Sequence, residues 1–397
     1  MMRVDGTTTG QRVHLWQNLM CLSYLMELKK MEDFFQANGC QVVDAPEEAD
    51  WVIVGACAAF HNQIDDFFTK LDELTSLPAQ VAVYGCVPKV ATERYAEVNS
   101  RVAFFMDTKS PHLVERVVPD CRVKWNQIPD ADGFRMVDYR KYDPTKKYVI
   151  IQHGCNAKCV FCPHSKGIGP QQSLSRERVL GNIRRSLTDG ARSILLEGRD
   201  AGSWGTDLQP AETFPDLLQS ILAIDQDFKL LLNQLGANWV IRYQDALLDL
   251  LLDRRVVDVH IPIQTSSNRL LKVMGREPGV RELQPFMEAL RERTDRPILR
   301  TDVMIGFPTE TEEEFKDTMA FVNEYFDEVA CYGFELHQNT EVAQMGLPFH
   351  EHAVIEDRVQ RALAMIKNNP RMVWHRGGQV PSTMLDREKH KEKLNRM

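Results

Sequence analysis

This sequence lacks long apolar runs, and it lacks an excess of positive charge. No stretch approaches the roughly 18 uninterrupted apolar residues that a membrane helix needs, and the opening MMRVDGTTTG lacks the apolar segment of a signal peptide. The formal net charge of −8 opposes the basic surface of a protein that grips a phosphate backbone by itself. We therefore expect a cytoplasmic protein that contacts no membrane, and nucleic acid is not favoured as a partner.

Cysteine is scarce as well, with 9 in 397 residues, yet three of them crowd into one loop. The stretch QHGCNAKCVFCPH sets Cys155, Cys159 and Cys162 in a C-x3-C-x2-C array directly after the apolar run YVII. An odd number of cysteines, clustered in a chain expected in a reducing compartment, disfavours a disulfide framework. These three thiols are therefore candidates for binding a metal or taking part in a reaction.

Three interpretations of this loop stay open from the spacing alone. Three thiolates can hold three corners of a four-iron cluster and leave one iron free to bind another molecule. A zinc ion is the second interpretation, with His153 or His164 as the fourth ligand that a closed site needs. The third is that the thiols are ordinary buried cysteines, which an exposed loop disfavours.

The first 120 residues alternate apolar runs with helical patterns, which predicts an open parallel α/β sheet. The runs VHLW, WVIVG and VAVYG have the length of strands, and a helical stretch separates each from the next. Cys21, Cys57 and Cys86 follow these three runs in turn. Because ligands of open α/β sheets bind beyond the carboxyl ends of the strands, these three thiols can converge there.

A second region of strands and helices follows a stretch without a clear pattern. Six apolar runs of strand length recur between residues 146 and 345, most of them followed by a helical pattern, and they predict a partial (βα)6 barrel. We expect an N-terminal α/β domain over 1–120, a linker over 121–145, the barrel over 146–345, and a helix with a charged tail over 346–397. The chemistry of such a barrel lies at the carboxyl ends of its strands, where the three-cysteine loop falls.

Longer motifs extend the pattern around this loop. The segment IQHGCNAKCVFC, with Phe161 directly before its last cysteine, resembles the signature of radical S-adenosylmethionine (SAM) enzymes. The segments IQTSSNRLLKVMGR and TDVMIGFPTETEEEF are similar to motifs of one branch, the methylthiotransferases that modify tRNA and a ribosomal protein. The match covers most of the chain. It implies a Rossmann-like N-terminal domain, a radical SAM barrel, SAM, and two [4Fe-4S] clusters.

The resemblance also divides six of the cysteines between two clusters. It implies that the SAM-binding cluster supports reductive cleavage of SAM to a 5′-deoxyadenosyl radical, which removes a substrate hydrogen. The second cluster would carry the sulfur that is methylated and transferred. The implied ligands are Cys155, Cys159 and Cys162 for the first cluster and Cys21, Cys57 and Cys86 for the second. The remaining three cysteines read as small apolar side chains: Cys40, Cys121 and Cys331.

Further positions at the strand ends are candidates for contacting SAM. Glu197 ends the second barrel strand, where radical SAM enzymes often bind the methionine amino group, and a surface ion pair is the alternative. Gln264 and Ser267 end the fourth strand, with plain loop hydrogen bonding as the alternative. Gly306 and Leu336 are also candidates, with a simple turn as the alternative for Gly306 and a core position as the alternative for Leu336. The remaining candidates are Phe161, Asp302 and Ile305.

Departures from the family pattern bear on the substrate. Family members usually end in a small β-barrel domain that engages a macromolecule, whereas the residues after Leu347 read as a helix and a tail of mixed charge. Tyr24 stands where the family has asparagine, and Asp200 is closer to the ribosomal-protein branch. Together with the acidic net charge, these differences favour a peptide or small molecule over tRNA.

We accordingly predict an enzyme that places a methylthio group on an unactivated C–H position of a peptide or small molecule. The alternatives are a tRNA or ribosomal-protein methylthiotransferase, and a radical SAM enzyme that inserts sulfur without transferring methyl. A non-enzymatic iron-sulfur protein, for electron transfer or redox sensing, is the alternative from another class. The predicted partners are an electron donor such as flavodoxin or ferredoxin and a source of sulfur.

Overall fold

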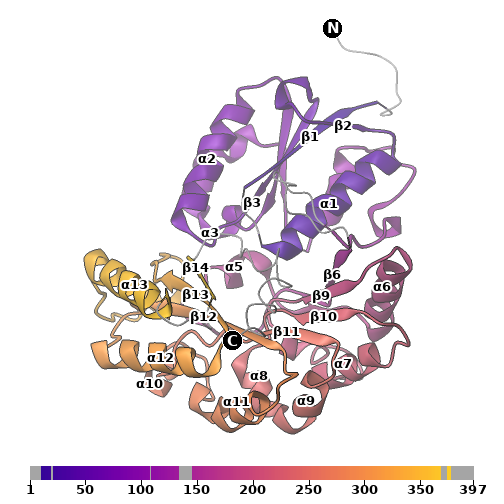
Figure 1. Ribbon diagram of the computed structural model, residues 1–397. Helices are drawn as coiled ribbons and strands as arrows, with labels where there is room; N and C mark the ends of the chain where they lie inside the picture. The colour runs from indigo at the N-terminus through magenta and orange to yellow at the C-terminus, as the bar shows by residue number, and fades with distance from the viewer. Residues whose placement is uncertain (1–9, 19–20, 108, 134–144, 368–372, 377–397) are drawn as a thin grey trace. The chain divides into compact units, whose positions relative to one another are not determined.

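The structure is a computed structural model that describes residues 10–18, 21–107, 109–133, 145–367 and 373–376. The chain divides into two compact units. Unit 1 comprises Met1–Val137 and the insertion Pro163–Pro170, and unit 2 comprises Asp138–Cys162 and Gln171–Met397. Each unit contains its own parallel sheet with helices around it (Figure 1). Among the described helices, none is long and apolar enough to cross a membrane.

Unit 1 is built on a five-stranded parallel sheet with the strand order β2-β1-β3-β4-β5, which confirms the predicted open α/β sheet. Its central strands β3 and β4 are buried almost from end to end, as is typical of parallel strands covered on both faces. The strands are β1 (Arg12–Gln17), β2 (Gln41–Val43), β3 (Trp51–Ala56), β4 (Gln80–Gly85) and β5 (Phe104–Met106). The α-helices that alternate with these strands are α1 (Leu22–Ala37), α2 (His61–Thr75), α3 (Val87–Val90) and α4 (Thr92–Val98).

Apolar side chains at helical spacing hold the helices of unit 1 against its sheet. Met31 and Phe34 of α1 are fully buried, and so are Phe67 and Leu71 of α2. Burying a side chain of this size stabilises the folded chain by about 1.5–3 kcal/mol. Trp125, beyond β5, adds to the same core, because its ring meets the ring of Phe34 edge to face with the centroids 6.4 Å apart. The core of unit 1 therefore includes residues that follow the sheet.

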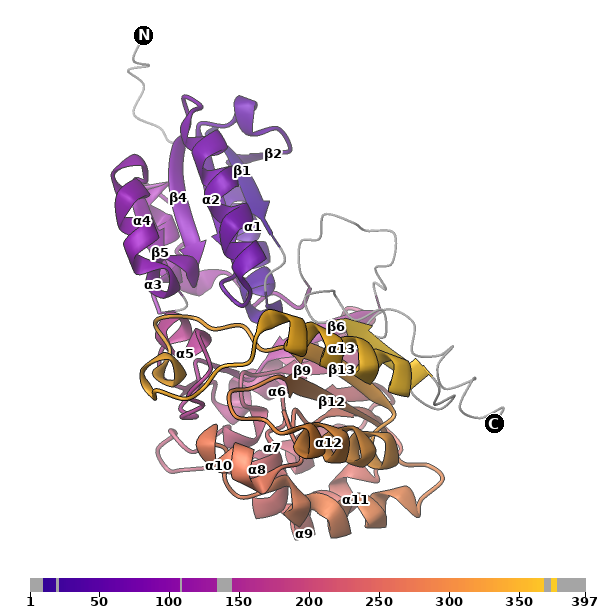
Figure 2. The ribbon, with the colours of Figure 1, turned by 90° about the vertical axis from the view of Figure 1, so that its left-hand side faces the viewer.

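Unit 2 is built on a parallel sheet in which the strands follow one another in chain order, β14-β13-β12-β11-β10-β9-β6. Helices follow the strands along the outside of this curved sheet (Figure 1, Figure 2). The strands β6 and β9 to β13 confirm the predicted partial (βα)6 barrel. Their bounds are β6 (Lys146–Ile150), β9 (Ser193–Glu197), β10 (Lys229–Leu232), β11 (Val256–His260), β12 (Ile298–Ile305) and β13 (Glu328–Gly333). The helices are α6 (Arg176–Thr188), α7 (Phe214–Leu222), α8 (Ala237–Arg242), α9 (Gln244–Leu251), α10 (Asn268–Val273), α11 (Gln284–Arg291), α12 (Glu312–Tyr325) and α13 (His352–Lys367).

A further strand, β14 (Val373–Arg376), extends the edge of this sheet, and the sequence does not predict it. It pairs in parallel with β13, so that Val373 lies opposite Glu328. It follows α13 and completes a β13-α13-β14 unit. The four residues VWHR contain only two apolar ones, a pattern too short to indicate a strand. Parts of the predicted linker (134–144) and charged tail (377–397) lie outside the described residues.

A short hairpin interrupts the alternation after the first barrel strand. β7 (Gln152–His153) pairs in antiparallel fashion with β8 (Gln172–Ser173). The insertion Pro163–Pro170 lies between these two strands in the chain, directly after the last cysteine of the three-cysteine loop. It contains α5 (His164–Ile168), which packs against α3 within unit 1. One continuous segment thus contributes to both units.

Candidate functional site

The carboxyl ends of the central strands of unit 1 carry the first cysteine set. Cys57 directly follows β3, Cys86 directly follows β4, and Cys21 lies shortly after β1 at the start of α1. β1 and β3 are neighbours, and the strand order reverses between them, because β2 lies beyond β1 and β4 lies beyond β3. The carboxyl edge at such a switch point is where open α/β sheets bind their ligands. The topology therefore brings these three cysteines to one edge.

The side chain of Asn18 connects the segments at this edge of the sheet by hydrogen bonds. Its Oδ1 accepts a hydrogen bond from the backbone N–H of Cys57 at 3.2 Å. Its Nδ2 donates to the carbonyl oxygen of Gln63, in the first turn of α2, at 3.0 Å. One amide thus links the loop after β1 with the residue after β3. Sequence reasoning passed over Asn18, although a polar residue directly after an apolar strand is a recognisable signal in loops that carry function.

Cys86 lies in a buried layer of aromatic and polar side chains. Its Sγ is 3.2 Å from the hydroxyl oxygen of Tyr24, and both residues are 1% exposed. The rings of Tyr24 and Tyr84 have centroids 5.0 Å apart, and the Tyr84 hydroxyl donates to the carboxyl group of Glu27. Burial raises the pKa of Glu27 to about 8, and the nearby Lys30 offsets only part of this effect. At neutral pH, Glu27 is therefore mostly protonated and adds little negative charge to this layer.

The helix α5 lies against Cys86 within unit 1. A Cβ atom placed on Gly167 would lie 2.9 Å from the Sγ of Cys86 and 2.8 Å from its Cβ. Packed interiors do not contain contacts this short, so a side chain at Gly167 would displace either Cys86 or α5. Glycine at this position therefore preserves the placement of the cysteine.

The three-cysteine loop leaves β6 in unit 2 through β7. Cys155, Cys159 and Cys162 are all half-buried. The Sγ of Cys155 accepts a hydrogen bond from the N–H of Ala157 at 3.3 Å, and the N–H of Cys162 donates to the carbonyl of Cys159 at 3.1 Å. Burial raises the pKa of the Cys155 thiol to about 12. The thiol therefore holds its proton at neutral pH, and a bound metal ion would have to displace it.

The end of the segment IQTSSNRLLKVMGR shapes this loop. Gly275 has a φ of +71°, and a Cβ atom there would lie 2.4 Å from the carbonyl oxygen of Lys158, so both the backbone and the space require glycine. The next residue, Arg276, donates from Nη1 to the Sγ of Cys159 at 3.4 Å. Sequence reasoning used this segment as a family motif and overlooked Arg276 as a contact of the cysteines.

Four neighbouring strands of unit 2 contribute a connected line of polar side chains. Asn233 donates from Nδ2 to Oε2 of Glu197 at 2.7 Å, and its Oδ1 lies 3.0 Å from Nδ1 of His260. The other ring nitrogen of His260, Nε2, lies 3.2 Å from Oδ1 of Asp302. Glu197 ends β9, Asn233 directly follows β10, His260 ends β11, and Asp302 lies in β12. This polar line therefore lies toward the end of the barrel where barrel chemistry is built.

The two carboxyl groups of the polar line differ in their electrostatics. Burial raises the pKa of Glu197. Burial acts on Asp302 too, but His260 and Arg300 outweigh it and hold the pKa of Asp302 below its usual range. Arg300 is itself fixed by Asp258, whose two carboxylate oxygens each lie 3.0 Å from its Nε. Burial thus disfavours the ionised form of Glu197, whereas the neighbouring cations favour the ionised form of Asp302.

The segment after β11 holds two of the candidate SAM contacts. Gln264 has a φ of +69°, which is uncommon for a residue other than glycine, and its N–H donates to the carbonyl of Asp302 at 2.9 Å. Ser267 caps α10 by accepting a hydrogen bond from the N–H of Leu270. Its hydroxyl also donates to Oε1 of Glu314 at 2.6 Å. Ser267 therefore makes the local hydrogen bonds of the alternative interpretation, whereas Gln264 holds a strained backbone at a strand end.

The other candidates lie in the turn after β12 and in the core around it. Gly306 has a φ of +78°, and its N–H donates to Oε2 of Glu310 at 2.9 Å. The ring of Phe161 meets the ring of Phe307 edge to face, with the centroids 6.3 Å apart. The candidates that pack in or against the apolar core of unit 2 are Phe161, Ile305 and Leu336.

The two units match two family models. Residues 149–322 match the radical SAM superfamily, and residues 15–107 match uncharacterized protein family UPF0004. A probable threonylcarbamoyladenosine tRNA methylthiotransferase of Pyrococcus horikoshii is 27% identical over 316 residues, which cover 77% of this chain and 72% of that protein. The ribosomal protein uS12 methylthiotransferase RimO of Thermotoga maritima is 27% identical over 312 residues, covering 76% and 71%. The chain belongs to the radical SAM methylthiotransferase family.

A third relative and a solved structure are also similar to this chain. A tRNA-2-methylthio-N(6)-dimethylallyladenosine synthase of Roseiflexus is 26% identical over 356 residues, covering 86% of this chain and 72% of that protein. The radical SAM methyltransferase TsrM of Kitasatospora setae, with tryptophan and a SAM analog bound, has a TM-score of 0.61 at 14% identity. That alignment covers 84% of this chain and 75% of the other. At this identity the likeness shows the fold alone.

Membership of the radical SAM family implies a [4Fe-4S] cluster, SAM and a reductant. The donor set of the three-cysteine loop fits such a cluster, because its three thiols provide three sulfur ligands on one short segment. Arg276 adds a hydrogen bond to one of these sulfurs, of the kind that orients and tunes a metal ligand. The loop therefore combines ligands with a supporting contact.

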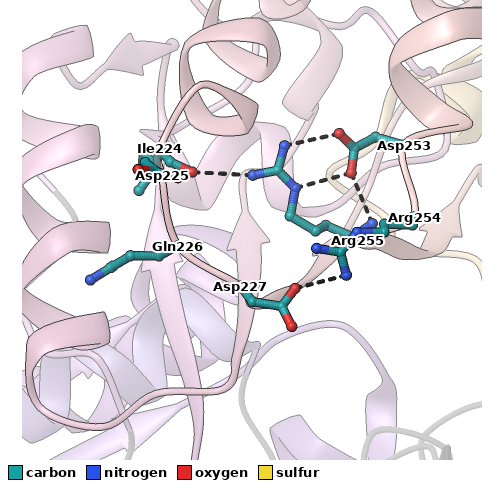
Figure 3. Close-up of a pocket in the computed structure, with 7 residues that line it drawn as sticks. All are labelled: Ile224, Asp225, Gln226, Asp227, Asp253, Arg254 and Arg255. Atoms are coloured by element: carbon teal, nitrogen blue, oxygen red, sulfur yellow. Dashed lines mark hydrogen bonds and ion pairs between the residues drawn. The ribbon is translucent and has the colours of Figure 1, made fainter.

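Unit 2 also has a surface pocket of about 660 Å³ (Figure 3). It is lined by residues 224–227 and 253–255, which precede β10 and β11. Arg255 donates from Nη2 to the carbonyl of Leu222 at 2.5 Å and to Oδ2 of Asp253 at 2.9 Å. These bonds fasten the end of α7 to the segment before β11. The pocket is therefore at the amino ends of the strands, where barrel residues serve stability rather than chemistry.

Proposed function

We propose that this chain is a two-cluster methylthiotransferase that places a methylthio group on an unactivated carbon of a tRNA or a ribosomal protein. The observation that carries the proposal is the pair of cysteine sets, each at the carboxyl ends of strands in its own parallel sheet. Thiolates in sets of three suit four-iron clusters that keep one iron open. The proposed ligands are Cys155, Cys159 and Cys162 for the SAM-binding cluster and Cys21, Cys57 and Cys86 for the second cluster.

The polar line of unit 2 supports a role in orienting SAM. When bound, the cluster and SAM supply a carbon radical that removes a hydrogen atom from the substrate. Glu197 suits the cationic amino group of SAM, because a positive charge beside this buried carboxyl would oppose the rise in its pKa and favour its ionised form. Asp302, already ionised, suits hydroxyl donors of the nucleoside half. Asn233 and His260 hold these two carboxyls in place.

The relatives support the proposed substrate class. The names of two of them specify tRNA, and the name of the third specifies ribosomal protein uS12. They favour a macromolecular substrate over the peptide or small molecule expected from the acidic net charge and the residues after Leu347. A tRNA substrate would bind with an affinity that falls steeply with salt, because phosphate contacts release counterions.

The substrate can be tested in cells that lack the protein. Bulk tRNA and ribosomal protein uS12 are isolated from a deletion strain and its parent, and methylthiolated nucleosides and the intact mass of uS12 are compared by mass spectrometry. We expect one of the two to lose a methylthio group. The intact protein should restore it, whereas the Cys155→Ala variant should not. If the deletion changes neither tRNA nor uS12, both are excluded as the substrate, and a peptide or small molecule becomes the favoured substrate.

The cofactor half of the proposal has its own test. The anaerobically reconstituted protein should bind about eight irons per chain. Replacing Cys155, Cys159 and Cys162 together with alanine should leave about four, because the second set is intact. Stoichiometric zinc with iron near zero in the native protein would contradict the two-cluster assignment and favour the zinc interpretation.

A further inference from the structure

One contact of the second cysteine set involves a side chain that is not a ligand. The hydroxyl oxygen of Tyr24 lies 3.2 Å from Sγ of Cys86, within hydrogen-bonding range for sulfur. Tyr24 belongs to α1, whereas Cys86 follows β4, so the contact joins elements far apart in the chain. Both side chains are almost completely buried. A buried hydroxyl beside a buried sulfur is a strong constraint, since moving either group breaks the bond without water to replace it.

The surroundings of Tyr24 fix its ring and hence its hydroxyl. Its ring lies against the ring of Tyr84, which is itself held by a hydrogen bond to Glu27. The helix α5 also approaches Cys86 so closely that only glycine fits at Gly167. Cys86 is therefore positioned by a hydroxyl and by close packing, both within unit 1.

The direction of this hydrogen bond depends on the protonation of the sulfur. A thiol donates its proton to the Tyr24 oxygen, which acts as the acceptor. A thiolate bound to iron has no proton, so the Tyr24 O–H would donate to the sulfur instead. A donor to a ligand sulfur draws negative charge from an iron-sulfur cluster and stabilises its reduced form, which raises the reduction potential. In this structure the Cys86 thiol is the donor, and the reverse direction requires the Tyr24 O–H to point toward the sulfur over the same 3.2 Å.

We propose that Tyr24 is a positioning residue of the second cluster: its hydroxyl donates a hydrogen bond to the Cys86 thiolate and raises the reduction potential of that cluster. The inference rests on the proposed two-cluster function. A simple packing role makes a different prediction, because phenylalanine would retain the ring contacts of Tyr24 and lose only the hydroxyl.

The test isolates the second cluster in the full-length chain. Cys155, Cys159 and Cys162 are replaced together with alanine, and Tyr24→Phe is added to this background. Iron content and the midpoint potential of the remaining cluster are measured by redox titration with electron paramagnetic resonance detection. The matched control is Tyr84→Phe, which removes a neighbouring buried hydroxyl that bonds to Glu27 rather than to a cysteine.

We expect about four irons per chain in all three proteins, because the ligands are unchanged. Tyr24→Phe should shift the midpoint to a more negative potential and change the paramagnetic spectrum, while Tyr84→Phe should shift the midpoint less. Four irons with the same midpoint in Tyr24→Phe as in its background, or an equal shift in Tyr84→Phe, would overturn the role of Tyr24 alone. An absence of iron from the background protein itself would overturn the second cluster and, with it, this inference.

Discussion

The two cysteine sets differ in how the chain brings them together. In unit 2, one loop carries all three cysteines, and local contacts shape it: glycine at Gly275 and the hydrogen bond from Arg276. In unit 1, three separate strand ends each supply one cysteine, so their convergence depends on the strand order and packing of the whole sheet. The first arrangement is visible in the sequence as a motif. The second is not visible in this way, because the three cysteines come close to one another only when the sheet has folded.

This difference predicts a division of labour that single cysteine variants can expose. Cys155→Ala should lower the formation of 5′-deoxyadenosine from SAM by at least about 100-fold, because it removes a ligand from the SAM-binding cluster. Cys57→Ala should retain much of this activity and lose sulfur transfer. Both products are measured by mass spectrometry after reduction with dithionite. Equal cleavage of SAM by both variants and the parent would show that the two sets do not have separate roles.

The same difference explains how much the sequence predicts. Buried parallel strands such as β3 and β9 are contiguous apolar runs, so the two sheets are predictable from local pattern. The polar line and the Tyr24–Cys86 bond are not, since they join residues whose proximity depends on strand register and helix packing. The only sequence feature that indicates Asn233 is its position as a polar residue after an apolar strand. The strand β14 is harder still to predict, because its two apolar residues are too few to show the alternation of a strand.

A small change in packing beside Cys86 should disrupt the cysteine set of unit 1. Gly167→Ala adds one methyl group within 3 Å of Cys86, which must move or displace α5. We expect the iron content of the reconstituted protein to fall from about eight toward about four per chain, because the distributed set loses its geometry. SAM cleavage should persist. The matched control is Gly181→Ala, where an added Cβ has no neighbour within 4 Å, and full iron loading of both variants would contradict this sensitivity.

The units also contain carboxyl groups whose pKa values shift in opposite directions. Burial raises the pKa of Glu27 in unit 1 from 4.5 to about 8. Its folded form keeps a proton that the unfolded chain has released, so between these values its contribution to stability falls as the pH rises. Glu27→Gln should therefore raise the free energy of unfolding by about 2–4 kcal/mol more at about pH 8.5 than at about pH 5. Urea unfolding of parent and variant measures this difference.

Glu314 in unit 2 provides the opposite case. Partial burial opposes the shift, but hydrogen bonds from Arg269 and Ser267 lower the pKa of Glu314 from 4.5 to about 2. Its stabilising contribution is present above the unfolded value and is lost as the pH falls toward the folded one. Glu314→Gln should thus destabilise the protein at neutral pH and have little effect near pH 2. If Glu27→Gln and Glu314→Gln show the same pH dependence, the contrast between the two carboxyls is wrong.

The smallest expected effect is the change in protein stability caused by the control substitution Gly181→Ala. Gly181 lies exposed in the interior of α6, and an added Cβ there meets no neighbouring atom. Glycine in a helix interior is destabilising relative to alanine, chiefly because the unfolded chain has more conformations to lose. Gly181→Ala should therefore stabilise the protein by about 0.5–1 kcal/mol, seen as a rise in Tm of about 1–2 °C. Iron content and SAM cleavage should not change, because the added Cβ contacts no other atom. The two glycine variants thus separate two effects: Gly181→Ala acts on the backbone and raises stability, whereas Gly167→Ala acts on the packing at Cys86 and removes a cluster. A fall in Tm for Gly181→Ala would contradict this separation.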